Sequence, residues 1–251
     1  LATVAVVLAA AAGCPETPPA DEGEGAGEGA GEGEGEGDPG FPAPHDKAPV
    51  VEDFGGPVLN YPSVRAVYFS GDPQQSDVDA FLPELQSSGY WAQVTSEYGV
   101  GDLTVGLPID LGAAPPPQTT TTSIITKFAQ VEPSPDPGTI YLFVIPQATT
   151  LEDDGECCLD FDGFHEQDAV GATSFAAAYA CGCEGDDGLQ FSSLDELAIT
   201  ISHELAESAT DPFNNPAYGG IDDDHVAWEI ETEGEVADMC EYLDNDAADV
   251  D

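Results

Sequence analysis

The pattern of hydrophobic and polar positions predicts several strands. Two runs rich in β-branched and aromatic residues, V-R-A-V-Y-F-S within 58–70 and T-I-Y-L-F-V-I-P at 139–146, are bounded by turn residues. The run at 139–146 is the most apolar of the expected strands, so we place it at the centre of a sheet. Shorter strands are expected at 103–108 and 174–180.

Helical spacing of apolar residues follows in other parts of the chain. The segment 76–98 is expected to be helical, with Ser76 as its cap and with Pro83 and Gly89 interrupting it. A shorter helix is expected at 123–131. Strands and helices in this mixture predict an α/β or α+β fold, with a mixed sheet and packed helices.

The segment 191–210 has the clearest helical pattern. Ser193 and Glu196 form a capping box before it, and Pro212 ends it. Six apolar residues recur at steps of three and four positions and predict one buried stripe: Leu194, Leu197, Ala198, Ile201, Leu205 and Ala209.

The other side of this helix carries the motif H-E-x-x-E. His203 and Glu207 are four positions apart and therefore share a face, about 200° and 240° around the helix from Ile201. An imidazole and a carboxylate in this arrangement can bind one metal ion, and Glu204 between them can accept a proton from water. The H-E-x-x-H helix of metallopeptidases works in this way, with His where this chain has Glu207. The alternative is a solvated polar face on a very acidic protein.

A zinc site with an open position needs a third protein ligand. Acidic candidates follow in 220–242, and among them we favour Asp238. The alternatives are Glu235, His225 and His165. A ligand set with two carboxylates also admits a harder divalent ion such as manganese or calcium.

Two further acidic features have simpler explanations. Asp211 lies eight residues after His203, about 12 Å along an unbroken helix, so we expect it to cap or buttress rather than to bind the same ion. The three aspartates at 222–224 could bind a structural Ca²⁺, but three adjacent aspartates more often form a solvated turn, which is the expected explanation.

The charge of the chain restricts its partners. Fifty acidic residues and three basic ones give a formal net charge of −47. Nucleic acids and anionic membrane surfaces are therefore excluded as expected partners, because phosphate binding requires clustered Lys and Arg. The main expected effect of the acidity is solubility.

The N-terminal region predicts export. Residues 1–12 are apolar but too few to span a bilayer, and they match the core of a secretory signal peptide whose N-terminus is incomplete. The ending A-A-G-C resembles a bacterial lipobox, which would make 1–13 a lipoprotein-type signal and Cys14 the lipid-anchored residue. An ordinary signal peptide is the alternative. We expect 14–49 to be a disordered acidic linker rich in Gly and Glu, and 50–251 to be one globular domain.

A loop-rich region at 151–188 holds four cysteines, and Cys240 lies far downstream. In an exported protein, disulfides are the expected state. Adjacent cysteines rarely bond to each other, so we expect one or two links between the first pair and the second pair: Cys157 and Cys158 with Cys181 and Cys183. A structural zinc cluster of these four residues is the alternative.

Several motifs resemble the phosphate-induced/EXORDIUM-like family. They are G-G-P-V-L at 55–59, the V-R-A-V-Y-F-S run, G-F-H at 163–165 and S-A-T-D-P-F-N-N-P-A-Y-G-G at 208–220. The likeness is to bacterial secreted members, which carry a similar H-E-L-A-E-x-x-T-D-P segment and a later E-x-x-D-x-C. Plant members are apoplastic growth-related proteins that lack the H-E pair, so the resemblance implies fold and export more than catalysis.

Together these observations predict an exported, lipid-anchored, zinc-dependent hydrolase that acts as a peptidase. The domain would be zincin-like around the helix that carries His203. His203, Glu207 and Asp238 would bind the metal, and Glu204 would be the general base. The expected substrate is a peptide or a component of the cell surface. The alternative is a non-catalytic EXORDIUM-like binding protein of the cell surface, with a structural or vestigial metal site.

Overall fold

The structure is a computed structural model, and it describes most of the chain after residue 49. The described residues are 50–146, 149–152, 155–183, 193–222, 225 and 234–238. The predicted signal peptide, Cys14 with its predicted lipid anchor, the predicted linker and Cys240 lie outside these ranges.

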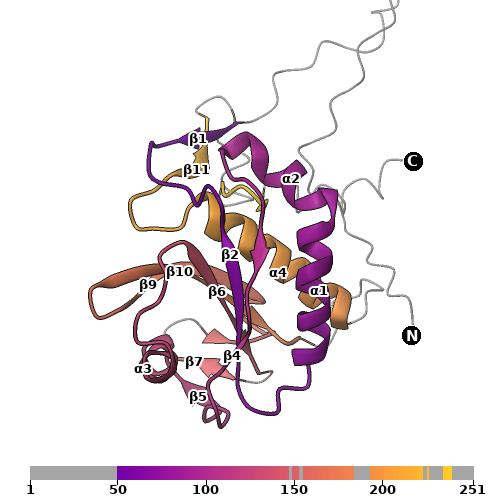
Figure 1. The fold of residues 1–251 in the computed structure, drawn as a ribbon, viewed down its shortest axis with the longest axis vertical. Coiled ribbons are helices and arrows are strands. Elements are labelled where there is room, and N and C mark those ends of the chain that lie inside the picture. Colours follow the sequence, from indigo (N-terminus) through magenta and orange to yellow (C-terminus); the bar gives the residue numbers. More distant parts are fainter. Residues whose placement is uncertain are drawn as a thin grey trace, which may run out of the picture.

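A six-stranded mixed sheet forms the centre of the domain (Figure 1). Its strands follow the order β3-β2-β6-β10-β9, and β4 also pairs with β2. Neighbouring strands are parallel except β9, which is antiparallel to β10. The strands are β2 (Ser63–Tyr68), β3 (Thr104–Val105), β4 (Ile109–Asp110), β6 (Thr139–Ile145), β9 (Gly163–Val170) and β10 (Thr173–Cys181).

Helices cover both faces of this sheet. Figure 1 shows α1 and α4 side by side on one face and α3 on the other. The helices are α1 (Gln75–Ser87), α2 (Gly89–Thr95), α3 (Thr121–Val131) and α4 (Ser193–Thr210), with a 3₁₀ turn at Ser96–Tyr98. The predicted mixed α/β class, with a mixed sheet and packed helices, is confirmed.

The central strand β6 separates two hydrophobic clusters. Ile140, Leu142 and Val144 pack with residues of α1 and α4. The alternate positions, Tyr141 and Phe143 among them, pack around Phe128 of α3. Successive side chains of a strand point to opposite faces, so a strand covered on both faces must be apolar throughout. This explains why all seven residues of β6 are buried, as the sequence predicted.

Small residues let α4 approach the sheet closely. Ala176, Ala178 and Ala180 of β10 all belong to the cluster that contains Ile201 and Leu205 of α4. Each of these three alanines is at most 1 % exposed. A methyl group in place of a longer side chain lets the helix backbone lie near the strands, and this proximity positions the functional site described below.

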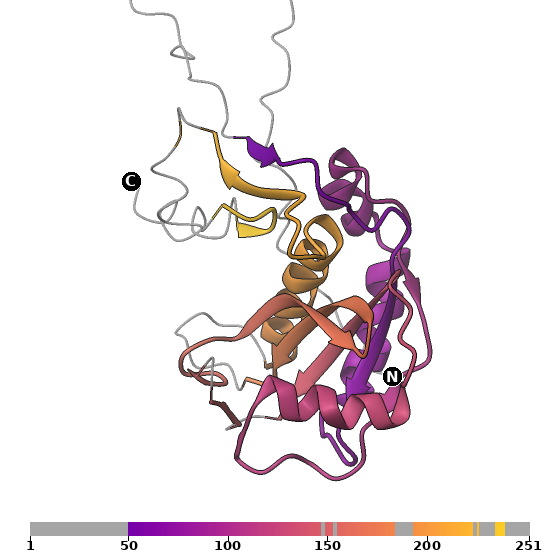
Figure 2. The same ribbon diagram turned by 90° about the vertical axis from the view of Figure 1, so that its left-hand side faces the viewer.

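Short strand pairs complete the fold. β1 (Val51–Asp53) pairs antiparallel with β11 (Tyr218–Ile221), and Figure 2 shows this pair above the end of α4. A three-stranded sheet contains β5 (Gln118–Thr119), β7 (Thr150–Leu151) and β8 (Gly155–Glu156). The segments 55–59 and 208–220, both part of the family resemblance, also meet: Leu59 N donates to Ala209 O at 2.9 Å, and Gly56 N donates to Pro216 O at 3.0 Å.

Some predicted boundaries were wrong. Gln74, not Ser76, occupies the N-cap position of α1, and it makes no side-chain capping bond. Pro83 lies inside α1 instead of interrupting it, because buried residues before and after it (Val78 and Leu85 among them) pack against the sheet. The break comes at Ser88, which has an extended backbone, and α2 begins at Gly89.

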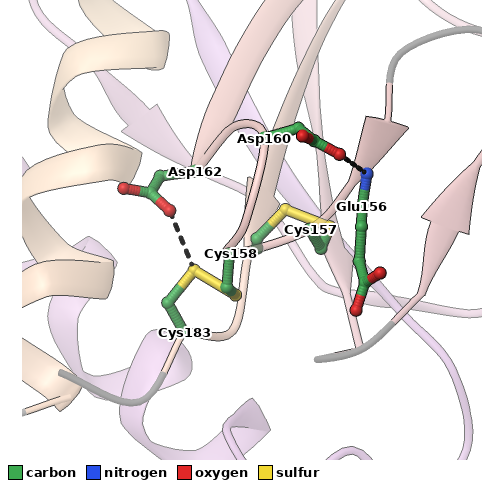
Figure 3. Close-up of a disulfide and its surroundings, with 7 residues drawn as sticks. Glu156, Cys157, Cys158, Asp160, Asp162 and Cys183 are labelled. Carbon is green, nitrogen blue, oxygen red and sulfur yellow. Dashed lines mark hydrogen bonds between the residues drawn. A yellow bond between two sulfur atoms is a disulfide. The ribbon is translucent and has the colours of Figure 1, made fainter. Parts of the chain in front are cut away.

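Two disulfides connect the segment between β8 and β9 to the end of β10 and the residues just after it. Cys157 bonds to Cys181, and Cys158 bonds to Cys183 (Figure 3). The expected links between the two cysteine pairs are confirmed. The zinc-cluster alternative is wrong, since sulfur atoms bonded to each other are not available as thiolate ligands. Disulfides of this kind persist in oxidising compartments, which is consistent with an exported protein.

Among the helices of the described residues, none is both long enough and apolar enough to cross a bilayer.

We expect Ala178→Leu to destabilise the domain by about 1–3 kcal/mol, because the larger side chain must fit between β10 and α4. The free energy of unfolding from denaturant titration measures this effect. Ala114→Leu, at an exposed position of a loop, is the matched control and should change stability little. Equal stability of the two variants would contradict the close packing of α4 on the sheet.

Candidate metal centre

The polar side of α4 is buried, not solvated. Glu204 and Glu207 are 5 % and 2 % exposed, and Ile201 and Leu205 on the predicted apolar stripe are fully buried. The alternative of a solvated acidic face is therefore wrong. Carboxylates are costly to remove from water unless they are paired or bind a cation, so their burial demands a specific arrangement around them.

His203 lies between two carboxylates. Its Nε2 atom is 3.2 Å from Glu207 Oε1, one helical turn further along α4. The same nitrogen is 3.1 Å from Asp238 Oδ1, which comes from the separate segment 234–238. The structure thus brings together the three residues that the sequence predicted as metal ligands.

A second histidine reaches the same carboxylates from the sheet. His165 of β9 lies directly opposite Ala178 of β10, and directly opposed residues of an antiparallel pair point to the same face. That face is the one covered by α4. His165 Nδ1 is 3.4 Å from Glu207 Oε2 and 3.8 Å from Glu204 Oε2. Glu235 Oε1 lies 4.0 Å from the other ring nitrogen, Nε2.

Gly163 allows this contact between β9 and α4. A Cβ atom at this position would lie 2.6 Å from both Glu204 Oε1 and Thr200 Cγ2. Such distances are far below van der Waals contact, so any side chain here would displace Glu204 or the helix. Because glycine has no side chain, Glu204, the proposed general base, can lie directly against this position of β9.

A second close approach holds the segment that supplies Glu235 and Asp238. A Cβ atom on Gly234 would lie 2.7 Å from Gly220 Cα, so the segment packs directly on β11. Figure 2 draws it in yellow next to that strand. Ala237 is buried with Val94 of α2 and Ala206 of α4. These contacts fix the two carboxylates beside the helix.

The carboxylate oxygens converge instead of pairing with one another. Among the described residues, Glu207 Oε1 and Glu204 Oε2 are buried and make no hydrogen bond. Glu207 Oε1 is close to His203 Nε2 but does not have the geometry of a hydrogen bond to it. Ligand atoms about 2.1 Å from a tetrahedral ion are about 3.4 Å apart, close to the separations around His203. The His203–Glu207 and His203–Asp238 separations are thus compatible with a shared metal ion.

Two overlapping groups of side chains could hold a divalent ion. One consists of His203, Glu204 and Glu207, and the other of His165, Glu207 and Glu235. Within each group, one ligand atom from every residue lies within 4.8 Å of the others. Glu207 belongs to both groups.

The carboxylates hold both histidines in the protonated form when no metal is bound. Burial lowers the pKa of His203, but the adjacent Asp238 and Glu207 outweigh burial and raise it to about 12. Burial likewise opposes protonation of His165, and the contacts with Glu204 and Glu207 raise its pKa to about 10. Burial favours the neutral form of Glu207, but the two imidazoles lower its pKa to about 2.

The pKa values of Glu204 and Glu235 are shifted in the opposite direction. Burial raises the pKa of Glu204, mainly because the charged form loses its hydration. Burial, together with the negative charge of Glu207, raises the pKa of Glu235 to about 7. The centre gathers four carboxylates around two imidazoles, an arrangement that an additional cation would stabilise.

The other acidic residues and histidines that the sequence singled out lie outside this centre or have a structural role. His225 Nδ1 is 2.6 Å from Asp222 Oδ1, so this histidine pairs with the aspartate three positions before it. Asp211 Oδ1 accepts a hydrogen bond from Ala217 N at 2.8 Å and so supports the turn after α4, as expected. The calcium alternative at 222–224 includes two residues outside the described ranges.

The sequence pointed less clearly to His165 than to His203. The region 151–188 was expected to be mostly loop, yet it contains the eight-residue strand β9. The alternation of residues in G-F-H-E-Q-D at 163–168 indicates a strand that contains His165. It places Gly163 and His165 on the helix-facing side and Phe164 on the other side, where Phe164 stacks on Tyr179 with ring centroids 4.5 Å apart.

Fold and site together define a mixed α/β domain with a buried histidine–carboxylate centre that could hold metal. A comparison with protein-family models found no match, and a comparison with curated proteins found no similar chain. The EXORDIUM-like resemblance therefore stays a prediction from the motifs quoted above.

We expect Gly163→Ala to destabilise the domain by about 1–3 kcal/mol and to weaken metal binding, since the new methyl group overlaps Glu204. Denaturant unfolding and metal titration measure the two effects. Gly138→Ala is the control, because a Cβ atom there meets nothing closer than 3.4 Å. A Gly163→Ala protein with unchanged stability and affinity would contradict the close contact between β9 and α4.

The raised histidine pKa values predict that metal binding depends on pH. Only a neutral imidazole can bind a metal ion, so binding must release protons, and the apparent affinity for Zn²⁺ should rise between about pH 6 and pH 8. Calorimetry in buffers of different ionisation enthalpy measures both the affinity and the protons released. His225→Asn should behave as the wild type, and an affinity independent of pH would show that these histidines are not ligands.

Proposed function

We propose that this protein is an exported metal-dependent hydrolase that cleaves peptide bonds. The observation that carries the proposal is the pair of buried carboxylate oxygens, Glu207 Oε1 and Glu204 Oε2, that face two imidazoles without a hydrogen bond among the described residues. Buried anionic oxygens without hydrogen bonds are costly. A divalent cation together with a water molecule would satisfy them.

His203, Glu207 and Asp238 form the primary ligand set. Their ligand atoms come from two elements, and the atoms around His203 Nε2 are 3.1–3.2 Å away. A bound Zn²⁺ would polarise the scissile carbonyl and increase the acidity of a water molecule. One imidazole with two carboxylates leaves more negative charge on the ion than three imidazoles would, so Mn²⁺ or another hard divalent ion is the alternative cofactor.

Glu204 is the general base. It precedes the ligand Glu207 by three positions, belongs to the same group of converging ligand atoms and keeps one oxygen without a hydrogen bond among the described residues. As water attacks the carbonyl carbon, Glu204 accepts its proton. It then donates that proton to the amide nitrogen as the carbon–nitrogen bond breaks. The raised pKa of Glu204 brings it nearer to the operating pH, which favours both transfers.

The same proposal places the protein at the cell envelope. The two disulfides require an oxidising compartment for their formation. The apolar stretch 1–13 would direct export, Cys14 would carry the lipid anchor, and 14–49 would tether the domain. The substrate would be a peptide or a protein of the cell surface.

One observation favours a second candidate, a non-catalytic binding protein of the EXORDIUM-like type. Glu207 and Asp238 are only 2 % and 9 % exposed, and so deep a site would also suit a structural metal ion. In this case the ion would hold the segment 234–238 against α4 without taking part in a reaction.

Glu204→Gln tests the catalytic role. We expect the variant to retain its metal, measured by inductively coupled plasma mass spectrometry, and to lose about 10²–10⁴-fold in the rate of cleavage of a peptide library. Glu84→Gln, which makes the same change at an exposed position of α1, is the matched control and should keep full activity.

His203→Asn tests metal binding, and we expect it to lose the ion bound by His203 and, with it, activity. A metal-containing wild type that cleaves no peptide would support the binding protein and overturn the hydrolase. A wild type that binds no divalent ion would overturn both forms of the metal proposal.

A further inference from the structure

We propose that the centre holds two divalent ions, with Glu207 as a bridging carboxylate between them. This inference rests on the proposed metal-dependent function and extends it to a second site. The second ion would be bound by His165 and Glu235, from elements other than the H-E-x-x-E helix.

The two oxygens of Glu207 face different histidines. Oε1 is 3.2 Å from His203 Nε2, and Oε2 is 3.4 Å from His165 Nδ1. A carboxylate whose oxygens point to separate imidazoles has the arrangement of a bridge, because each oxygen can bind one ion. Ions bridged in this way are about 3.5–4 Å apart in two-metal hydrolytic sites.

Each histidine also has its own terminal carboxylate. Asp238 accompanies His203 at 3.1 Å, and Glu235 accompanies His165 at 4.0 Å. Each imidazole therefore lies near one terminal carboxylate and one oxygen of Glu207, but the two halves differ. Asp238 and Glu207 face the same nitrogen of His203, whereas Glu235 faces Nε2 of His165 and Glu207 faces Nδ1. The second half has one ligand atom from each residue within 4.8 Å of the others.

The charge of the centre fits two ions better than one. Glu204, Glu207, Glu235 and Asp238 contribute four negative charges when ionised, and neutral imidazoles contribute none. Two divalent ions neutralise all four, whereas a single ion leaves the remaining carboxylates to be balanced by a protonated His165 or by protons of their own. Uncompensated charge is costly at a position as buried as Glu207 and Glu204, which are 2 % and 5 % exposed.

Burial supplies an observation independent of the acidic cluster. Glu204 Oε2 is 3.8 Å from His165 Nδ1, too far for a hydrogen bond, and it has no hydrogen bond to any described residue. The oxygen is nevertheless directed into the half that contains His165. A second ion, or the water bound to it, would occupy the region that this oxygen faces.

The two halves are held by different parts of the fold. His165 comes from β9 of the central sheet, and His203 comes from α4. Loss of the His165 half should therefore leave the His203 half able to bind one ion. Only Glu207 is common to both.

Manganese binding to the full chain tests the proposal. Mn²⁺ is added to metal-free protein, bound metal is measured by mass spectrometry, and the electron paramagnetic resonance spectrum is recorded. We expect about two ions per chain and the spectrum of an exchange-coupled pair, because the bridge brings the ions within about 4 Å. His165→Asn should bind about one ion per chain and show the spectrum of an isolated Mn²⁺ ion.

Glu235→Gln provides a second test that preserves folding, since the side chain of Glu235 is 39 % exposed. It should likewise lower the stoichiometry from about two ions to one and abolish the coupled spectrum. Asp102→Asn, at an exposed position, is the control and should retain the wild-type spectrum.

The outcomes separate this inference from the proposed function. One ion per chain in the wild type, lost in His203→Asn and kept in His165→Asn and Glu235→Gln, would overturn the second site and leave the hydrolase intact. Two ions without magnetic coupling would overturn the bridge. No bound ion would overturn the second site and the proposed function together.

Discussion

The close packing of α4 on β9 and β10 is the constraint on which the rest of the molecule depends. It requires very small residues in the facing strands, supplied by the alanines of β10 and by Gly163. Because the helix lies so near the strands, Glu204 and Glu207 are buried and lie close to His165. A larger residue at any of these strand positions would separate the helix from the sheet and the carboxylates from the histidine.

Burial of the carboxylates in turn determines the chemistry of the centre. An ionised carboxylate in a protein interior needs a hydrogen bond, a cation or a proton. Here the pKa of Glu207 is lowered and the pKa of Glu204 is raised, although the two carboxylates share the same buried surroundings. Such a separation is typical of sites in which one carboxylate remains charged as a ligand and another exchanges protons.

Much of the fold was readable from local patterns. The apolar run at 139–146 predicted the central strand, and the stripe through Ile201 predicted the inner face of α4. Prediction from the sequence was wrong where tertiary packing overrides the local preference of the residues. Pro83 stays within α1 because its neighbours are buried, and β9 has too many polar residues to stand out as a strand until its register with β10 is known.

The sequence by itself determined the helix with His203, Glu204 and Glu207 on one side, because helical spacing alone places them there. It also predicted one or two disulfides between the first cysteine pair and the second, and the structure has two. Only the tertiary structure decided that this side of the helix is buried, and that His165, Glu235 and Asp238 meet it. Their positions follow from sheet register and from the contact of Gly234 with Gly220, and neither of these long-range relations is present in the local pattern of the chain.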